Sequence, residues 1–228
     1  MRYLILMALF LFLVFMTFLP GSCKSCEPFV DNVLDKIIYI NLDNRTDRRE
    51  EIESELDEKG LDYERFSAIK DDRGAIGCCK SHLAVLKKAR DHGYQNILVL
   101  EDDFQFLVDK PEFEKQLKML FDVHFDVCLL SYNTNYLQDS PYPFLCKITD
   151  AQTTSGYLVQ SHYYDTLISQ WEHGLKMFQE TGNEQLYTCD QSWKTLQERD
   201  IWYCFKERIG IQRDSYSDIQ NGFVRSGV

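Results

Sequence analysis

Positively charged residues are scarce in this sequence: 25 lysines and arginines face 36 aspartates and glutamates, which gives a formal net charge of −11 at pH 7. Proteins that bind nucleic acid normally carry a basic stripe that displaces counterions from the phosphate backbone. The acidic balance therefore argues against a nucleic-acid partner. It still allows a small anionic ligand that a metal ion and a few arginines hold locally.

Low-complexity stretches and internal repeats are also absent, and the sequence contains neither a glycine-rich phosphate-binding loop nor a paired-histidine metal motif. The last two absences leave a metal-dependent phosphohydrolase without a supporting motif. The chain has 228 residues, of which 44% are hydrophobic and 14% aromatic, enough to bury a substantial core. One globular domain of ordinary size is expected, rather than two.

A long hydrophobic run covers residues 3–19, with Arg2 before it and Pro20 after it. This pattern predicts a signal peptide or a signal anchor rather than a part of the fold. About 17 residues is near the lower limit for crossing a bilayer, so cleavage and membrane retention both stay open. We expect the rest of the chain in the lumen of the secretory pathway, as a type II membrane protein, or secreted after cleavage. The predicted division is signal segment 1–23, linker 24–34, folded domain 35–220 and tail 221–228.

The cysteines number eight, an even set, and a lumenal location would permit disulfides between them. Their pairing cannot be read from the sequence. Cys78 and His82 are four residues apart on a predicted helix and would lie on one face of it. Two ligands do not make a metal site, so core positions are the favoured interpretation.

Apolar runs alternate with amphipathic segments along the rest of the chain. Residues 36–41 and 96–100 predict buried strands. Helices are expected over residues 46 to about 60 and from about 78 to 92, the second ended by Gly93. Strands that alternate with helices predict an α/β fold with a mostly parallel sheet covered on both faces. Such a sheet gathers its ligands at the carboxyl ends of its strands.

The later elements are less sharply marked. Strands are expected at residues 125–130 and 156–160, and helices at 161–173 and 190–198. Residues 133–143 are polar, aromatic and interrupted by proline, which is typical of a loop. This loop is a candidate wall for the site of a second substrate.

Three consecutive carboxylates, Glu101, Asp102 and Asp103, directly follow the predicted strand 96–100. Unpaired charges are costly at the end of a buried strand, and a divalent cation would compensate them. Residues i and i+2 of an extended segment project to the same side, so Glu101 and Asp103 are expected to face one cation while Asp102 points elsewhere. Hard carboxylate oxygens suit Mg²⁺ or Mn²⁺. A solvated acidic loop is the plainer interpretation of the same triplet.

Several segments of the chain follow one another in a recognisable order. They are Ile40-Asn41-Leu42-Asp43-x-Arg45-x-Asp47-Arg48-Arg49, Phe66-x-Ala68-Ile69, Gly74-Ala75-Ile76-Gly77-Cys78-x-x-Ser81-His82, Leu98-Val99-Leu100-Glu101-Asp102-Asp103, Thr154-x-Gly156-Tyr157, Asp190-Gln191-x-Trp193 and Gln212-x-x-x-Ser215-x-Ser217-Asp218-Ile219. In this order they resemble glycosyltransferase family 25, which includes bacterial lipooligosaccharide galactosyltransferases and procollagen galactosyltransferases. The resemblance covers nearly all of residues 36–219, and the ordered set is far more specific than any one motif.

The resemblance implies a GT-A-type fold and an inverting transfer of a hexose, galactose or glucose, from a UDP-sugar to a hydroxyl of a glycan or a collagen-like protein. It also implies Mn²⁺, or Mg²⁺, bound through an acidic motif of the DxD kind. The motif here begins with Glu101, one methylene longer than a strict DxD. The division of roles between Glu101 and Asp102 is therefore open, and Asp103 is the firmest metal ligand.

Inversion in one displacement needs a base that deprotonates the acceptor hydroxyl. Asp190, which opens the predicted helix 190–198, is the first candidate, and Asp218 is the second. A carboxylate at a helix start has a plain structural alternative as a cap. Trp193 would offer an apolar face to a sugar ring, although a tryptophan at helical spacing is more often part of the core.

The remaining candidates would contact the donor. Arg45 and Arg48 follow the first strand, where their guanidinium groups suit diphosphate oxygens, although surface arginines in a first helical turn would look the same. Asn41 and Asp43 are expected to contact the nucleoside. Two more residues, Ser81 and His82, are expected to line the site, with a satisfied interior histidine as the conservative alternative.

Two functions of other classes compete with sugar transfer. One is a non-catalytic binding module that keeps the fold without turnover, and the other is the metal-dependent phosphohydrolase. The enzyme interpretation is favoured because the acidic triplet and the Asp190 segment are both intact. Donor hydrolysis without transfer to an acceptor would favour the phosphohydrolase.

Overall fold

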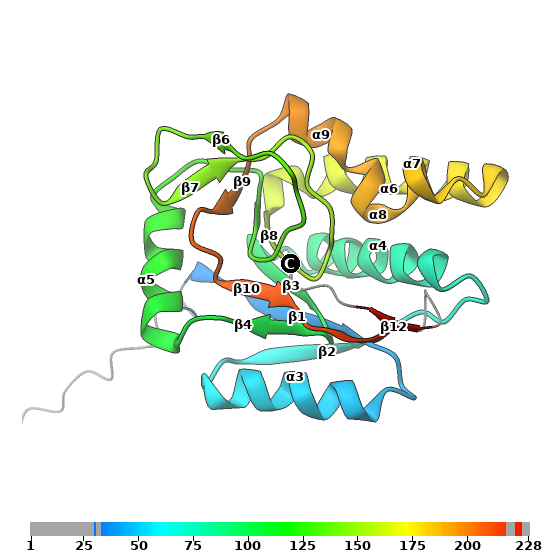
Figure 1. Ribbon diagram of the computed structural model, residues 1–228, viewed down its shortest axis with the longest axis horizontal. Coiled ribbons are helices and arrows are strands. Elements are labelled where there is room, and N and C mark those ends of the chain that lie inside the picture. The colour runs from blue at the N-terminus through cyan, green and yellow to red at the C-terminus, as the bar shows by residue number, and fades with distance from the viewer. Residues whose placement is uncertain (1–29, 31–32, 218–221, 225–228) are drawn as a thin grey trace, which may run out of the picture.

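The computed structural model describes residue 30, residues 33–217 and residues 222–224 (Figure 1). The predicted signal segment and most of the predicted linker and tail lie outside the described residues, as do Cys23, Cys26 and Asp218. Within the described part of the chain, no helix combines the length and the apolar character needed to cross a membrane.

Strand β1 (Lys36–Asn41) shows why the sheet needs a layer of helices on each face. Successive side chains of a strand point to opposite faces, and Ile38 and Tyr39 are both fully buried. Ile38 packs in the same core as the apolar residues of α4 (Gly74–His92), whereas Tyr39 packs with those of α3 (Thr46–Glu58). Two hydrophobic cores therefore sandwich the sheet.

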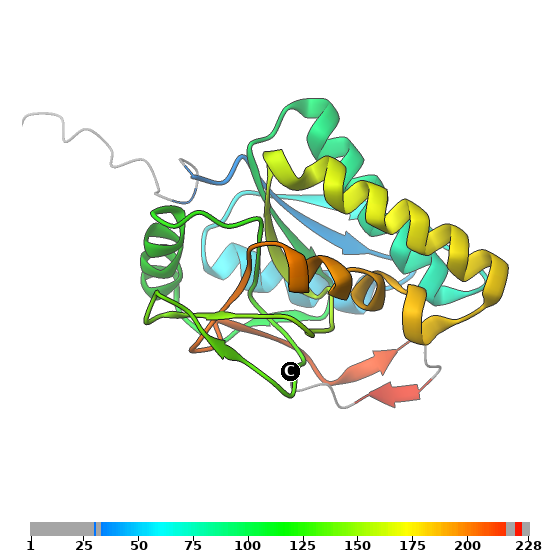
Figure 2. The same ribbon diagram turned by 90° about the horizontal axis from the view of Figure 1, so that it is seen from above.

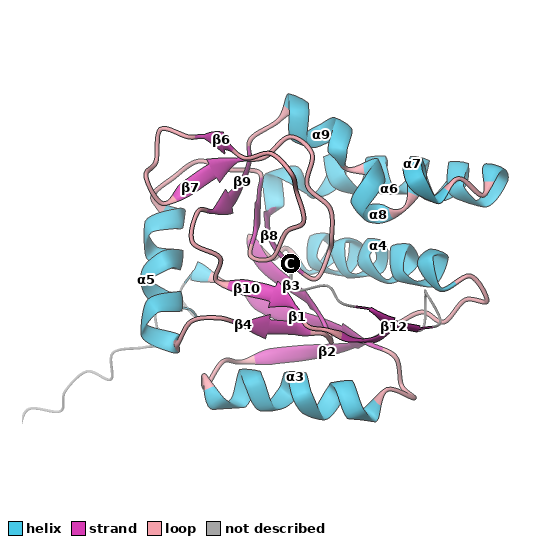
Figure 3. Cartoon of the chain, viewed as in Figure 1, coloured by secondary structure: helices cyan, strands magenta, loops and turns pink. Residues whose placement is uncertain are grey.

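Eight strands form one mixed sheet in the described part of the chain (Figure 3). β1 pairs in parallel with both β2 and β3, and β5 pairs in parallel with β9, whereas β8 and β7 run against their neighbours. Most strands thus point the same way, which confirms the predicted α/β fold with its mostly parallel sheet. The order across the sheet is β2 (Tyr63–Ser67), β1, β3 (Asn96–Glu101), β8 (Gly156–Gln160), β5 (Val127–Leu129), β9 (Trp202–Phe205), β7 (Leu145–Lys147) and β6 (Gln138–Asp139).

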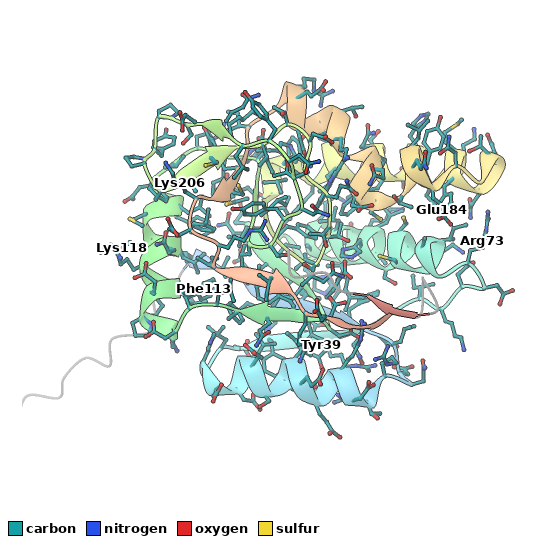
Figure 4. All side chains as sticks on the ribbon, viewed as in Figure 1. Tyr39, Arg73, Phe113, Lys118, Glu184 and Lys206 are labelled. Carbon is teal, nitrogen blue, oxygen red and sulfur yellow. The ribbon has the colours of Figure 1, made fainter. Side chains whose placement is uncertain are left out.

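Helices cover both faces of this sheet, as the sequence predicts. α3 and α5 (Lys110–Phe121) pack on one face, and α4 and α6 (Tyr164–Thr181) on the other. Figure 2 shows α6 lying along α4. Figure 4 shows Phe113 of α5 directed toward the sheet and Lys118 directed away from it. The short helices are η1 (Ser161–Tyr163), α7 (Glu184–Tyr187), α8 (Cys189–Ser192) and α9 (Lys194–Arg199).

The ends of the predicted helices are set mainly by glycine. Gly60 and Gly93 follow α3 and α4 with φ values of 55° and 72°, in the left-handed region that ends a helix. α4 begins earlier than expected, at Gly74. The helix expected over residues 190–198 is divided at Trp193 into α8 and α9.

A short antiparallel pair connects the end of the chain to the acidic triplet. β4 (Phe104–Phe106) pairs with β10 (Gly210–Gln212), with Gln212 opposite Phe104. A second pair, β11 (Ser215–Ser217) with β12 (Gly222–Val224), follows it. The pairing of β4 with β10 brings Gln212 next to Asp103.

Two glycines make room for the ring of Phe104. A Cβ on Gly156 would lie 2.5 Å from this ring, and a Cβ on Gly210 would lie 2.2 Å from it. Gly156→Ala is therefore expected to lower the free energy of unfolding by about 1–3 kcal/mol, the usual effect of overpacking a core. Chemical denaturation measures the change, and adding Phe104→Leu should recover part of it. An unchanged unfolding free energy for Gly156→Ala would contradict this account.

The cysteines in the described part of the chain are all free thiols. Cys146 and Cys204 are partners across the β7 and β9 pairing, and both are buried in the core. The disulfides that a lumenal location would permit are therefore not present among these cysteines.

Candidate functional site

A cavity of about 780 Å³ lies at the carboxyl ends of β1 and β3, where the topology of the sheet predicts a ligand site. Its other walls are the loop after β2 with the start of α4, residues 152–154, and the α7–α8 region, whose Glu184 is labelled in Figure 4. The predicted site residues that line it are Asn41, Arg45, Arg48, Ser81, His82, Glu101, Asp102, Asp103 and Asp190.

The acidic triplet forms the floor of this cavity, but its geometry differs from the prediction. β3 ends at Glu101, and Asp102 and Asp103 lie in a turn. The alternation of an extended strand therefore does not apply, and Asp102 does not point away from Asp103. Nη1 of Arg48 lies 2.8 Å from Oδ1 of Asp102 and 3.2 Å from Oδ2 of Asp103. One guanidinium thus binds both aspartates.

The surroundings of Asp103 disfavour the charged form of its carboxyl group. Burial, followed by the charge of Glu101, raises its pKa to about 7. Its Oδ2 accepts hydrogen bonds from Arg48 and Gln212, but its buried Oδ1 has no hydrogen-bond partner among the described residues. A buried carboxylate oxygen without a donor is unfavourable unless a cation binds it. The residues present therefore fit a divalent cation with hard oxygen ligands.

Glu101 faces a different set of partners. Its Oε1 accepts a hydrogen bond of 2.5 Å from Thr154 and lies 3.2 Å from Nε2 of His82. The other ring nitrogen of His82, Nδ1, lies 3.1 Å from the hydroxyl of Tyr157. His82 is fully buried. It is therefore the satisfied interior histidine of the conservative interpretation, and it also lines the cavity.

Glu101 completes a group that the helix spacing alone left with two members, Cys78 and His82. Ligand atoms of Cys78, His82 and Glu101 all lie within 4.8 Å of one another. Burial opposes a charge on His82, but Cys78 and Glu101 both favour it, and the net effect raises the pKa of the imidazole. The third ligand comes from β3, a contact that the spacing within one helix cannot predict.

Asn41 has a structural task beside the triplet. Its Nδ2 donates to Oδ2 of Asp102 and to the carbonyl oxygen of Arg45, and its Oδ1 accepts from Arg65. The whole amide is thus bound to protein groups and positions Asp102. Asp43, the other predicted nucleoside contact, is not among the cavity-lining residues, and its exposed carboxylate binds Arg65 at 2.6 Å.

Two further predicted residues line the cavity through contacts with neighbouring segments. The guanidinium of Arg45 lies 2.8 Å from the carboxylate of Asp47. Ser81 donates to the carbonyl oxygen of Gly77 and accepts from the backbone N–H of Ile69, so it ties the loop after β2 to α4. Ser81 therefore shapes the cavity wall.

Asp190 lines the cavity from α8. Its Oδ1 accepts a 2.8 Å hydrogen bond from the hydroxyl of Thr188, and its Oδ2 accepts a 3.3 Å bond from the backbone N–H of Thr153. The N-cap of α8 is Thr188, and Asp190 lies in the first turn of the helix rather than at the cap position. Its carboxylate instead holds two segments of the cavity wall together.

Thr153 and Gln212 connect the two acidic parts of the site. Thr153 has a φ of 74°, which is strained for a β-branched residue. Its hydroxyl donates to Oε1 of Gln212, whose Nε2 in turn donates to Asp103. Gln212 stands in one of the family-like motifs and Thr153 precedes another, but nothing in the sequence indicated that they meet at Asp103.

Two other expectations for the cavity need revision. Trp193 is fully buried, stacks on Trp171 and donates to the carbonyl oxygen of Ala151, so it belongs to the core and offers no face to a sugar. Within the loop at residues 133–143, which includes β6, Asn133 is the residue that lines the cavity. Asp218, the second candidate base, lies outside the described residues.

Comparisons with known proteins agree with the family resemblance. No family profile matches the chain. Over 148 residues it is 31% identical to procollagen galactosyltransferase 2 of Homo sapiens, and over 114 residues it is 30% identical to a glycosyltransferase 25 family member of Aedes aegypti. These matches cover 52% and 38% of this chain, but only 23% and 18% of the respective relatives.

A solved structure supports the fold. It is a glycosyltransferase involved in glycosylation of the major capsid of PBCV-1, with a TM-score of 0.50 at 11% identity, covering 82% of this chain and 95% of that one. At this identity the likeness concerns the fold alone. Both relatives in the sequence comparison are named as sugar transferases, and this chain spans less than a quarter of the length of each. The chain is thus similar in sequence to members of glycosyltransferase family 25 and has the GT-A-like α/β fold that its motifs imply.

Proposed function

We propose that the chain transfers a hexose, galactose or glucose, from a UDP-sugar to a hydroxyl of a glycan or a collagen-like protein, with inversion at the anomeric carbon. The observation that carries this proposal is the buried Oδ1 of Asp103, which has no hydrogen-bond partner among the described residues. It lies at the carboxyl end of a strand, beside two more carboxylates and within a cavity large enough for a substrate.

Asp103 is the central ligand for Mn²⁺ or Mg²⁺ in this proposal, with a further oxygen from Glu101 or Asp102. Arg48 contacts both Asp102 and Asp103, and its one positive charge does not balance two carboxylates. When bound, the cation supplies Lewis acidity to the leaving nucleoside diphosphate. Asn41 and Gln212 hold the two aspartates in place from either side.

Asp190 is the proposed base. It lines the same cavity, and the hydrogen bonds from Thr188 and Thr153 fix the orientation of its carboxylate. In the proposed displacement it accepts the proton of the acceptor hydroxyl as the new glycosidic bond forms. Asp218 stays the second candidate for this role. Arg45 lines the cavity on the β1 side, and in this proposal its guanidinium binds the diphosphate of the donor.

A screen of nucleotide sugars tests the proposal. The full chain is incubated with Mn²⁺ and each nucleotide sugar, with and without glycan and collagen-like peptide acceptors, and the released nucleoside diphosphate is measured. We expect release from a UDP-hexose that needs the metal and rises at least about tenfold with the correct acceptor. Metal-dependent release that no acceptor stimulates would support a phosphohydrolase instead. Donor binding without release would identify a non-catalytic module.

A further inference from the structure

A second group of metal-ligating side chains lies at the other end of the sheet. Strand β8 begins beside the cavity, just after Thr154, and ends just before His162 of η1. Its five residues span about 17 Å at the usual rise of a strand. At this far end, ligand atoms of His124, Asp126 and His162 all lie within 4.8 Å of one another.

Asp126 is a fixed and mostly buried member of this group. Its Oδ2 accepts a 2.7 Å hydrogen bond from the backbone N–H of Ile201, and its Oδ1 lies 2.7 Å from Nε2 of His162. Its relative exposure is 9%. The bond from the backbone orients the carboxylate without using Oδ1, which is the arrangement expected of a preorganised metal ligand.

The two imidazoles are arranged face to face. The rings of His124 and His162 stack at a centroid distance of 5.5 Å and an angle of 25°. A simple ion pair between Asp126 and His162 needs no second imidazole, yet two of the five histidines of the chain converge on this one carboxylate. Both histidines are exposed, so an ion from solvent has access to them.

We propose that His124, Asp126 and His162 form a binding site for a divalent transition-metal ion, with Zn²⁺, Ni²⁺ and Cu²⁺ as the chemical class. Two imidazoles and one carboxylate suit these ions, whereas Mg²⁺ and Ca²⁺ prefer oxygen ligands alone. Three protein ligands leave a further coordination position to water. This site is separate from the proposed catalytic metal in position and in ligand type, and it does not rest on sugar transfer.

The bound ion would join two segments that the sequence keeps apart. His124 lies between α5 and β5, and His162 lies in η1, directly before α6. The two segments already meet through the backbone, where Gln160 donates to the carbonyl oxygen of Asp126 at 3.3 Å. Since the ion binds the folded chain through both, a hundredfold excess over its dissociation constant should raise the melting temperature by roughly 5–10 °C.

Equilibrium dialysis of the full chain against Zn²⁺, together with thermal melting, tests the site. His124→Ala should weaken binding of one Zn²⁺ at least about tenfold and abolish the associated rise in melting temperature. Because His124 is exposed, this variant should fold normally. His92→Ala, an exposed histidine in α4, is the matched control and should bind like the native chain.

Two further variants distinguish this site from the group that Cys78, His82 and Glu101 form at the cavity. Cys78→Ser removes a ligand from the Cys78, His82 and Glu101 group and should leave the ion that depends on His124 in place. Asp126→Asn should weaken the same ion as His124→Ala. The proposal is overturned if His124→Ala binds Zn²⁺ like the native chain, or if Cys78→Ser alone removes all bound Zn²⁺.

Discussion

Asp103→Asn is expected to abolish Mn²⁺-stimulated sugar transfer, with a loss of at least about 100-fold, while the chain stays folded. The reason is that the amide is neutral and, with its oxygen at the Oδ2 position, presents an NH₂ group to the cation in place of the Oδ1 ligand. The contacts from Arg48 and Gln212 to Oδ2 can still be accepted by the amide oxygen. Released nucleoside diphosphate, measured over a range of Mn²⁺ concentrations, reports the loss.

The same substitution should not destabilise the metal-free chain. The pKa of Asp103 is raised from 3.8 to about 7, so the folded state holds its proton more tightly than the unfolded state. The carboxyl therefore lowers stability progressively as the pH rises through this interval, and its full cost is present above about 7. Without metal, Asp103→Asn should melt at or above the native temperature at pH 8, and the difference should shrink toward pH 4.

Asp43→Asn is the matched control, because that aspartate is exposed and does not line the cavity. It should retain transfer within about threefold of the native chain. Full activity of Asp103→Asn in the presence of a chelator would remove the triplet from the mechanism. A collapsed fold at pH 8 would instead contradict the balance of charges described for the turn.

Asp190→Asn is expected to lower transfer by at least two orders of magnitude without a large change in stability. A general base contributes about 10²- to 10⁴-fold, and an amide cannot accept the acceptor's proton. Its oxygen can still accept one of the bonds from Thr188 and Thr153, so the melting temperature should stay near the native value. Steady-state kinetics at saturating donor, with binding of donor and Mn²⁺ measured separately, isolate the catalytic loss.

Thr188→Val provides the matched comparison, since it removes a hydrogen bond to Asp190 but keeps the carboxylate. It should retain far more activity than Asp190→Asn. If Asp190→Asn turns over near normally with unchanged melting, the carboxylate has only its structural role of joining α8 to residues 152–154. Asp218→Asn would then be examined in the same way.

Much of the fold follows from sequence patterns that physical rules interpret directly. β1 and β3 lie where the apolar runs predict them, and Gly93 ends α4 as expected. A helix was expected between the strand at residues 96–100 and the next predicted strand, where α5 lies, but its bounds were not predicted. Asp109 caps it, Pro111 lies in its first turn, and Phe113, Leu117 and Leu120 repeat at helical spacing. These capping and spacing patterns are visible in the sequence and predict the bounds of this helix.

The site was only partly accessible to sequence reasoning. Its floor was predicted because the triplet directly follows a buried strand. The side on which each carboxylate lies was not predicted correctly. The strand ends at Glu101, so the alternation of side chains along an extended strand does not apply to Asp102 and Asp103. Gln212 reaches Asp103 through the pairing of β10 with β4, a long-range contact that no local pattern encodes.

The guanidinium of Arg48 binds Asp102 and Asp103 together, so both aspartates already have a positively charged partner when no metal ion is bound. This resident counter-charge offsets part of the repulsion within the acidic turn in the absence of any divalent ion. The cation of the proposed function would compete with an arginine that is already in contact with its ligands. The donor diphosphate would offer Arg48 another anion to bind, so its binding should increase the occupancy of the metal site. The apparent affinity for the metal should therefore be higher with donor bound, and the apparent affinity for the donor higher with metal bound.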